Sequence, residues 1–435
     1  MHAPAEPDGA PRIAVLDILR GLAILGILFM NVADMGGSIV AASFEIRHLG
    51  WSPADRIAWW LREVFAAGTA RAMLELLFGA GMVILTDRAD RLMDDRAVRR
   101  GYGSRNLVLF AFGLVHVFVL LWPGDILHTY AIAATIAVLF RRMSPRALLA
   151  IGLVCASWQL AVSGIAYQQL QAQRARVAAI ETGQQAGIAP SPADRRIIAE
   201  ASIRVRAIAA QRGRTLAAIA SEDAARTGGF ASWAGAAWRY FIDLQRDGLE
   251  ALFVWQSASV MLIGAALFKL GILQGRRSRR WYLAAMAGGY AVGLALRIVG
   301  AAETMGADGA PRTIWATYEI ARLAMTLGHL ALVNLLVSTV VGARLLRPFA
   351  AAGRAALTIY IAQTIICLWL IFPPFALGWY ARLGWAQLML VALAVDAVLL
   401  LAAIAWFRRF AIAPVEWAWR SLVETRPLPW RAAAR

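Results

Sequence analysis

Three ionisable side chains in the N-terminal half of the chain have the types and spacing for acid–base chemistry. His116 lies in an apolar run, a Pro123–Gly124 turn follows, and Asp125 and His128 come next, three residues apart. A turn this short makes the flanking helices antiparallel neighbours, so the three side chains can approach one another. A carboxylate beside an imidazole raises the basicity of the ring and fixes its tautomer, which a general base requires.

The pattern therefore predicts a catalytic group, with His116 as the general base, Asp125 as its orienting partner and His128 as the rival base. A neutral imidazole can take a proton from a hydroxyl or an amine at physiological pH. A histidine buried in a membrane helix can also serve only as a hydrogen-bonding link between helices. This structural interpretation stays open for both rings.

A second polar group lies near the start of the first apolar run, residues 12–31. Asp17 and Arg20 are one helical turn apart in it. Charges are costly in hydrocarbon, so such pairs normally face a protein interior or a water-filled cavity. Together with Arg105 and Arg354, at the same ends of other expected helices, they are predicted to form a cytoplasm-facing pocket for a phosphate-bearing donor. The alternative interpretation of Asp17 and Arg20 is a structural ion pair.

The remaining polar side chains inside apolar runs carry weaker signals. Three uncharged ones are predicted to line a substrate cavity, namely Asn31, Gln256 and Gln363. Four charged ones have the helical spacing of intrahelical ion pairs, namely Arg71 with Glu75 and Glu319 with Arg322. Asp396 has no partner evident from the sequence.

The composition indicates a membrane protein. The chain has 435 residues, of which 60% are hydrophobic and 16% charged, and 17 are tryptophan, a residue that suits membrane interfaces. Apolar runs of roughly 17–25 residues can span a bilayer. They predict an all-α, polytopic fold with about ten transmembrane helices, at 13–35, 68–86, 105–122, 125–141, 145–167, 247–273, 281–300, 313–342, 349–372 and 386–407. The two cysteines lie inside such runs and are expected to pack as small apolar side chains, so no metal site is predicted.

The net charge of +17 comes from arginine-rich loops between the apolar runs. They lie at 87–105, 141–146, 275–280, 344–348 and 408–410, and all five are cytoplasmic if the N-terminus is. This positive-inside pattern predicts that both termini are cytoplasmic, and it gives no reason to expect a nucleic-acid partner.

The predicted helices and loops divide the chain into three regions. Residues 1–167 and 246–435 are expected to form two bundles of five transmembrane helices each, the second with a cytoplasmic tail. Between them, residues 168–245 are a polar insert on the exported side, in which a break at 187–192 predicts two helices. The insert is either a solvated helical hairpin or partly disordered insertion, or a substrate-recognition cap. Residues 51–66 are expected to form a helix lying in the exported interface.

Six motifs, in order along the chain, carry a resemblance to a known family. They are LDILRGLAILGILFMN, LLFGAGM, GLVH followed by GDILHTYA, MLIGAALFKLGIL, GRAALTIYIAQTII and APVEWAWR. The chain thereby resembles the YeiB family of bacterial inner-membrane proteins, which is described mainly as having unknown function. The first half of that family is distantly similar to transmembrane acyltransferases, which use a buried histidine to deliver an acyl group from cytoplasmic acyl-CoA to an acceptor across the membrane.

The resemblance implies a bacterial inner-membrane location, acyl-CoA as the donor substrate, and the histidine of GLVH and the aspartate of GDIL as the reactive pair. Two other classes stay open: a transporter or proton-coupled permease of a small solute, since charges inside a membrane can mark a solute path, and a non-catalytic scaffold. The lipid bilayer is an expected partner in every case. The acyl group, the acceptor and the formation of a homo-oligomer are left open.

Overall fold

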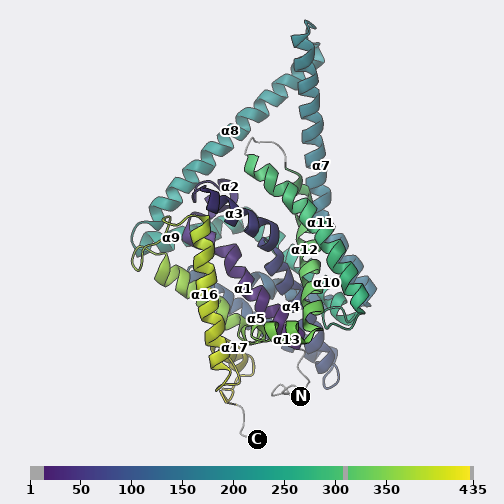
Figure 1. The fold of residues 1–435 in the computed structure, drawn as a ribbon, viewed down its shortest axis with the longest axis vertical. Coiled ribbons are helices and arrows are strands. Elements are labelled where there is room, and N and C mark those ends of the chain that lie inside the picture. Colours follow the sequence, from purple (N-terminus) through teal and green to yellow (C-terminus); the bar gives the residue numbers. More distant parts are fainter. Residues whose placement is uncertain (1–13, 307–311, 432–435) are drawn as a thin grey trace.

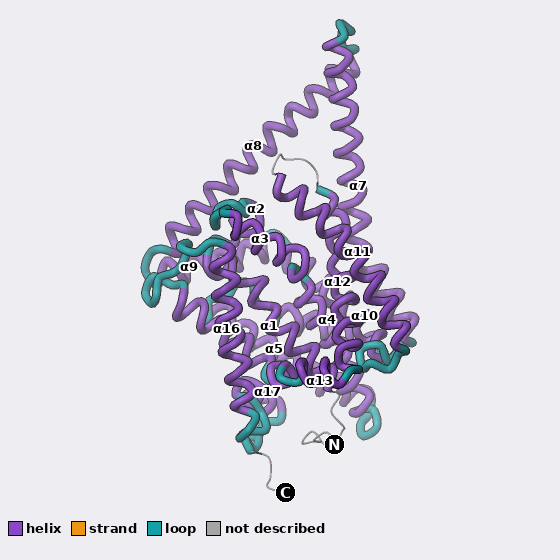
Figure 2. Tube along the Cα trace, in the orientation of Figure 1, coloured by secondary structure: helices purple, strands orange, loops and turns teal. Residues whose placement is uncertain are grey.

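The structure is a computed structural model that describes residues 14–306 and 312–431, and these residues form helices and loops with no strand among them (Figure 1, Figure 2). The helices are α1 (Ala14–Gly36), α2 (Ile39–Phe44), α3 (Pro53–Leu61), η1 (Arg62–Ala66), α4 (Thr69–Ala89), α5 (Asp95–Phe118), α6 (Leu127–Ala137), η2 (Val138–Phe140), α7 (Pro145–Gln185), α8 (Pro192–Arg226), α9 (Phe230–Arg246), α10 (Leu249–Lys269), α11 (Arg279–Gly306), α12 (Thr313–Val337), α13 (Val340–Leu346), α14 (Phe349–Arg354), α15 (Ala356–Ile365), η3 (Ile366–Ile371), α16 (Trp385–Trp406) and α17 (Pro414–Val423).

Within the described part of the chain, seven segments are long and apolar enough to cross a membrane. They are α1, the segment Pro53–Ala89, α7, α10, α11, α12 and α16. Two shorter apolar helices, Leu127–Phe140 and Ala356–Ile371, and the arginine-bearing α5 account for the other three predicted spans. The prediction of an all-α, polytopic membrane fold is therefore confirmed.

The two ends of the helical bundle are marked by different elements. The start of α1 lies at the same end of the bundle as α13 and α17, whereas α2 and α3 lie at the other end (Figure 1). The termini themselves, residues 1–13 and 432–435, lie outside the described residues, as do residues 307–311 of the predicted exported loop. The assignment of the first end to the cytoplasm stays a prediction.

A cysteine in place of Gln185, at the exposed C-terminal end of α7, tests this orientation. The charge pattern predicts that an impermeant thiol reagent labels it in intact spheroplasts. Labelling that appears only after lysis would reverse the topology.

The insert at residues 168–245 is built on a helix longer than predicted. The fifth span was expected to end at residue 167, but α7 is continuous over 41 residues from Pro145 to Gln185. The break expected at 187–192 is confirmed, since α8 begins at Pro192 behind a capping box formed by Ser191 and Asp194. In Figure 1, α7 rises to an apex and α8 descends from it to α9. The sequence did not indicate this third helix of the insert.

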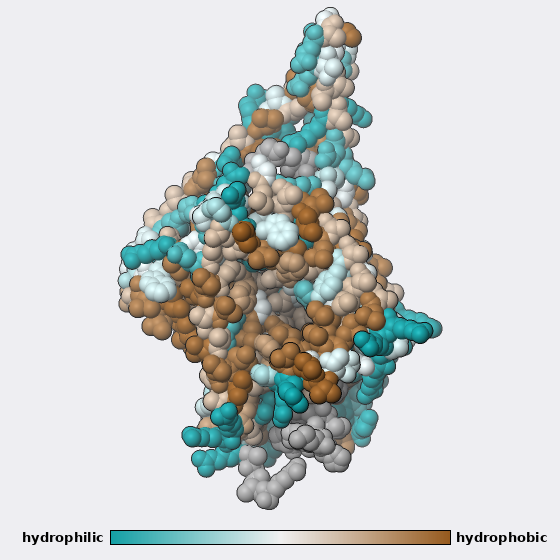
Figure 3. Space-filling view, viewed as in Figure 1, coloured by the Kyte–Doolittle hydropathy of each residue, from teal (hydrophilic) through white to brown (hydrophobic). Residues whose placement is uncertain are grey.

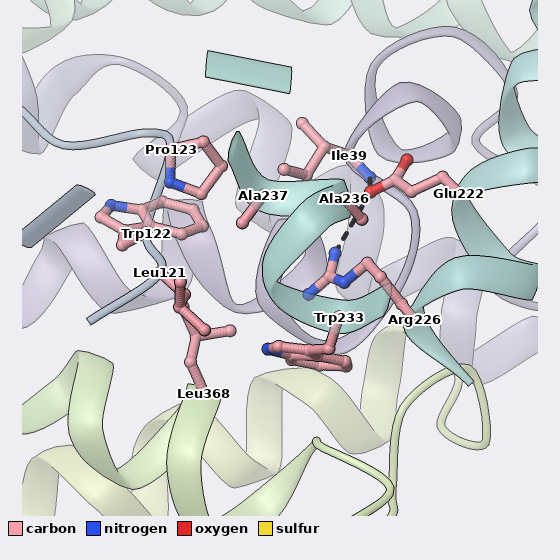
Figure 4. Close-up of a pocket in the computed structure, with 10 residues that line it drawn as sticks. All are labelled: Ile39, Leu121, Trp122, Pro123, Glu222, Arg226, Trp233, Ala236, Ala237 and Leu368. Atoms are coloured by element: carbon pink, nitrogen blue, oxygen red, sulfur yellow. Dashed lines mark hydrogen bonds and ion pairs between the residues drawn. The ribbon is translucent and has the colours of Figure 1, made fainter. Parts of the chain in front are cut away.

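The lower end of α8 is fixed to the bundle by Arg226, whose ion pair with Glu222 is drawn in Figure 4. Its guanidinium donates hydrogen bonds of 2.8–3.0 Å to three backbone oxygens in residues 34–37, where α1 ends. It also contacts the rings of Trp233 and Tyr380, at 4.6 and 4.4 Å from their centroids. A cation that caps otherwise unpaired carbonyls at a helix C-terminus is stabilising.

Glu222, one turn before Arg226, makes the complementary contact with α2. Its carboxylate accepts hydrogen bonds from the Ser38 hydroxyl at 2.6 Å and from the backbone N–H of Ile39 at 3.1 Å. The two residues of α8 therefore cap the end of α1 and the start of α2 together. The C-terminal part of the insert is thus a docked part of the bundle, whereas much of its upper part is solvent-exposed.

The second span is interrupted. The segment predicted as a separate interfacial helix at 51–66 forms α3 and the π-helical turn η1, and it continues through Gly68, with φ of 72°, directly into α4. Together they make up the apolar segment Pro53–Ala89. The position of α3 flat in the exported interface stays a prediction.

Candidate functional site

Asp125 joins the two histidines predicted to be reactive. One of its carboxylate oxygens lies 2.7 Å from Nδ1 of His116, and the other lies 2.8 Å from Nδ1 of His128 and accepts the backbone N–H of His128 at 3.0 Å. All three side chains are buried. The carboxylate can only accept hydrogen bonds when ionised, so each ring presents its Nδ1–H to Asp125. The contacts expected from the short turn are therefore present.

The second ring nitrogen of His116 faces a hydroxyl. Its Nε2 lies 2.8 Å from Oγ1 of Thr364 on α15. With Nδ1 protonated, Nε2 of the neutral ring is the acceptor of that hydroxyl. The ring of Tyr360 packs edge-on against the imidazole at 4.8 Å and fixes its plane. Hydroxyl, imidazole and carboxylate thus form one hydrogen-bonded series from Thr364 to Asp125.

The second ring nitrogen of His128 faces another carboxylate. Its Nε2 lies 3.2 Å from Oε2 of Glu250, an ion-pair distance without the angles of a hydrogen bond. The other oxygen of Glu250 accepts the hydroxyl of Thr129 at 2.7 Å. Neither Thr364 nor Glu250 was predicted from the sequence to belong to the site. The only signal for them was their polarity within or beside apolar runs.

Close contact between α5 and α6 makes this geometry possible. A Cβ added to Gly113 would lie 2.4 Å from the backbone nitrogen of His128 and 2.7 Å from the carboxylate of Asp125. Any side chain at residue 113 would therefore displace the start of α6. Gly113 lies nearly one turn before His116, so one face of α5 supplies both the close approach and the reactive ring.

At the other end of the bundle, Asp17 and Arg20 form the expected ion pair, with 3.0 Å between their charged atoms. The Arg20 guanidinium also lies 3.5 Å from the backbone oxygen of Gly353, where α14 crosses α1 so closely that a Cβ on Gly353 would overlap the Asp17 oxygen. The Arg20 side chain keeps 35% of its surface exposed. The Arg20 side chain is therefore positioned by contacts within the protein, and about a third of its surface stays accessible.

The two other arginines predicted for this pocket contact aromatic rings. Arg354 lies 3.6 Å from the ring centroid of Phe407 and donates to the backbone oxygen of Ala411. Arg105 lies 4.4 Å from the Trp419 ring of α17. Both arginines thus help to fix the segment after α16 against the bundle, in addition to any part they have in binding.

The three uncharged candidates are placed in different ways. Gln363 is buried, and its amide nitrogen donates to Asp396 at 2.8 Å and to the backbone oxygen of Ile24 at 3.2 Å. It therefore supplies the partner for Asp396 that the sequence did not reveal. Asn31 on α1 and Gln256 on α10 are both half-buried.

The two expected intrahelical ion pairs are present and form a single network. Arg71 lies 3.0 Å from Glu75 on α4, and Arg322 lies 2.8 Å from Glu319 on α12. Glu75 also lies 3.0 Å from Arg322 and accepts the Ser257 hydroxyl of α10 at 2.8 Å. Two positive and two negative side chains thus join three spanning segments with no net charge.

The fold and these buried groups define a polytopic helical membrane protein with ionisable side chains enclosed between its helices. Residues 267–426 match the family described as "Protein of unknown function (DUF418)". The chain is 29% identical over 441 residues to the uncharacterized protein YxaH of Bacillus subtilis (strain 168), covering 98% of this chain and 96% of that protein. It is 27% identical over 439 residues to the uncharacterized protein YeiB of Escherichia coli (strain K12), covering 94% and 96%.

Over nearly its whole length the chain is therefore similar to YxaH and YeiB, two uncharacterized proteins, and its C-terminal part matches a family of unknown function, in line with the resemblance of its motifs. A shorter match, 29% identical over 120 residues, links it to an uncharacterized 39.9 kDa protein of Bacillus acidopullulyticus, of which it covers 31%. No solved structure matches the chain.

Proposed function

We propose that this protein is a membrane acyltransferase that moves an acyl group from cytoplasmic acyl-CoA to an acceptor at the exported face. The observation that carries the proposal is the series Thr364–His116–Asp125, with contacts of 2.8 and 2.7 Å. An acceptor hydroxyl or amine in the place of the Thr364 hydroxyl would meet an imidazole nitrogen already oriented to take its proton.

The proposed reaction has two steps, attack of the acceptor on the thioester and departure of coenzyme A. The acceptor gives its proton to Nε2 of His116 and attacks the carbonyl carbon of the thioester. The carbon–sulfur bond breaks, and the sulfur of coenzyme A takes the proton back from the ring. Asp125 stabilises the imidazolium between the two steps and keeps Nδ1 protonated.

The test uses the purified full-length protein in liposomes with an acyl-CoA. Binding of the thioester followed by release of free coenzyme A supports the proposal. Thioester binding without turnover under any acceptor supply, together with uptake of a solute, would favour a transporter instead.

The donor side gives a separate prediction. Arg20→Ala should weaken acyl-CoA binding roughly tenfold, because a charge-assisted hydrogen bond to phosphate is lost. Arg142→Ala is the matched control, since Arg142 is an exposed arginine in a surface ion pair with Asp95. Titration of each variant with acyl-CoA measures the effect. Equal affinities in the wild type and Arg20→Ala would remove Arg20 from the donor site.

One observation favours the second candidate function, a transporter. The broken segment Pro53–Ala89 has its interruption at Gly68, close to Arg322 of the charge network. Discontinuous spanning helices beside buried charges are a feature of transporter sites. Proteoliposomes that move protons or a solute without acyl-CoA would support this alternative.

A further inference from the structure

An apolar groove of about 290 Å³ lies between α1, the η1–α4 segment and α12. Leu19, Leu22 and Gly26 form one wall, Phe65 and Met73 a second, and Leu332 a third. In the view of Figure 3 the apolar face is hollowed near its centre, between the helices that Figure 1 labels α16 and α12. The groove is therefore recessed within the membrane-spanning part of the bundle.

The polar groups that line this groove already have partners within the protein. His329 uses both ring nitrogens, one with the Phe65 backbone oxygen at 3.0 Å and one with the Tyr290 hydroxyl at 2.9 Å. The Thr69 hydroxyl donates to the Ala66 backbone oxygen at 2.8 Å. A polar ligand would lose its own hydrogen bonds on entry and find few in return. The chemistry of the lining thus selects hydrocarbon.

The groove opens at the level of the spanning helices. Its walls belong to three of the segments apolar enough to cross a membrane, and Phe65 at its edge keeps 43% of its surface exposed. At that depth the molecules available are lipids, whose chains match the lining. A lipid chain on a flat helix surface touches protein on one side, whereas a chain here packs against three helices, which increases its dispersion contacts.

We propose that this groove is a binding site for one acyl chain of a membrane phospholipid that enters from the bilayer. The size agrees with part of a single chain, because apolar cavities of ~150 Å³ already bind a molecule as large as benzene. The proposal does not depend on acyl transfer.

The test reconstitutes the full-length protein in phosphatidylethanolamine liposomes with a phospholipid that carries a photoactivatable diazirine halfway along one acyl chain. After irradiation, labelled peptides are mapped. We expect the residues of α1 and α12 that face the groove to be labelled several-fold more densely than Leu390 of α16, although Leu390 is 64% exposed. Labelling spread over the spanning helices in proportion to their exposure would overturn the proposal.

Variants that fill the groove with a larger side chain test whether labelling depends on the groove itself. Leu22→Trp should reduce labelling of α12 several-fold, and Leu332→Trp, from the opposite wall, should do the same to α1. Leu390→Trp is the matched control on an exposed surface and should leave both unchanged. A filled groove that is labelled as strongly as the wild type would contradict the site. If a variant does not remain monodisperse, the other variant and the wild-type map decide.

Discussion

His116→Ala is expected to lower acyl transfer by about 10²–10⁴-fold, the usual contribution of a positioned acid–base group. Binding of acyl-CoA should change little, because His116 lies among the contacts of α6 and α15 and not beside Arg20. The measurement is the release of free coenzyme A under single-turnover conditions, combined with a separate titration of thioester binding. A reduced rate with intact binding is the signature of a base that acts in the chemical step.

His128→Ala is the matched comparison, since it removes the other imidazole on Asp125. Its effect should be milder, because His128 lies between two carboxylates, Asp125 and Glu250, and faces no hydroxyl through its second nitrogen. The opposite ranking would make His128 the base. Full activity of both variants would exclude histidine chemistry from the mechanism.

Arg322→Met should lower the free energy of unfolding by about 3–5 kcal/mol, the typical effect of removing one partner from a buried ion pair. The change leaves the carboxylate of Glu319 without its cation, and Glu75 is then paired with Arg71 alone. Thermal unfolding of the detergent-solubilised protein, followed by circular dichroism, measures the loss.

The control for this prediction is Arg142→Met. Arg142 is 65% exposed and lies 3.1 Å from Asp95, so its removal should cost only about 0–1 kcal/mol. Adding Glu319→Gln to Arg322→Met should restore part of the lost stability, because the carboxylate that lost its cation is then replaced by a neutral amide. Equal losses in Arg322→Met and Arg142→Met would mean that the network carries no special stability.

The spanning helices and the His116–Asp125 contact could be predicted from sequence because both depend on local information. The length of an apolar run determines whether it can cross a membrane, and a turn as short as Pro123–Gly124 brings its two flanks together. The extension of α7 to Gln185 could not be predicted in the same way. Beyond residue 167 the segment becomes polar, but its helix propensity does not fall. The composition therefore predicted the end of a helix at a point where the helix continues.

Contacts between residues far apart in the sequence could not be predicted either. Thr364 is 248 residues from His116, and Arg322 is 247 residues from Glu75. Their contacts depend on the order of the helices around the bundle, which periodicity does not encode. For the same reason Arg105 and Arg354 could be assigned to one end of the bundle, whereas their aromatic partners Trp419 and Phe407 could not.

The attachment of α8 to α1 gives the insert a mechanical property. An uninterrupted α7 of 41 residues is ~60 Å long, so the apex is held by a stiff strut on one side and by α8 on the other. Arg226 binds the final backbone carbonyls of α1. The α7–α8 hairpin is therefore attached directly to the helix that carries Asp17 and Arg20. A displacement of α8 is therefore expected to reach the end of α1 through Arg226.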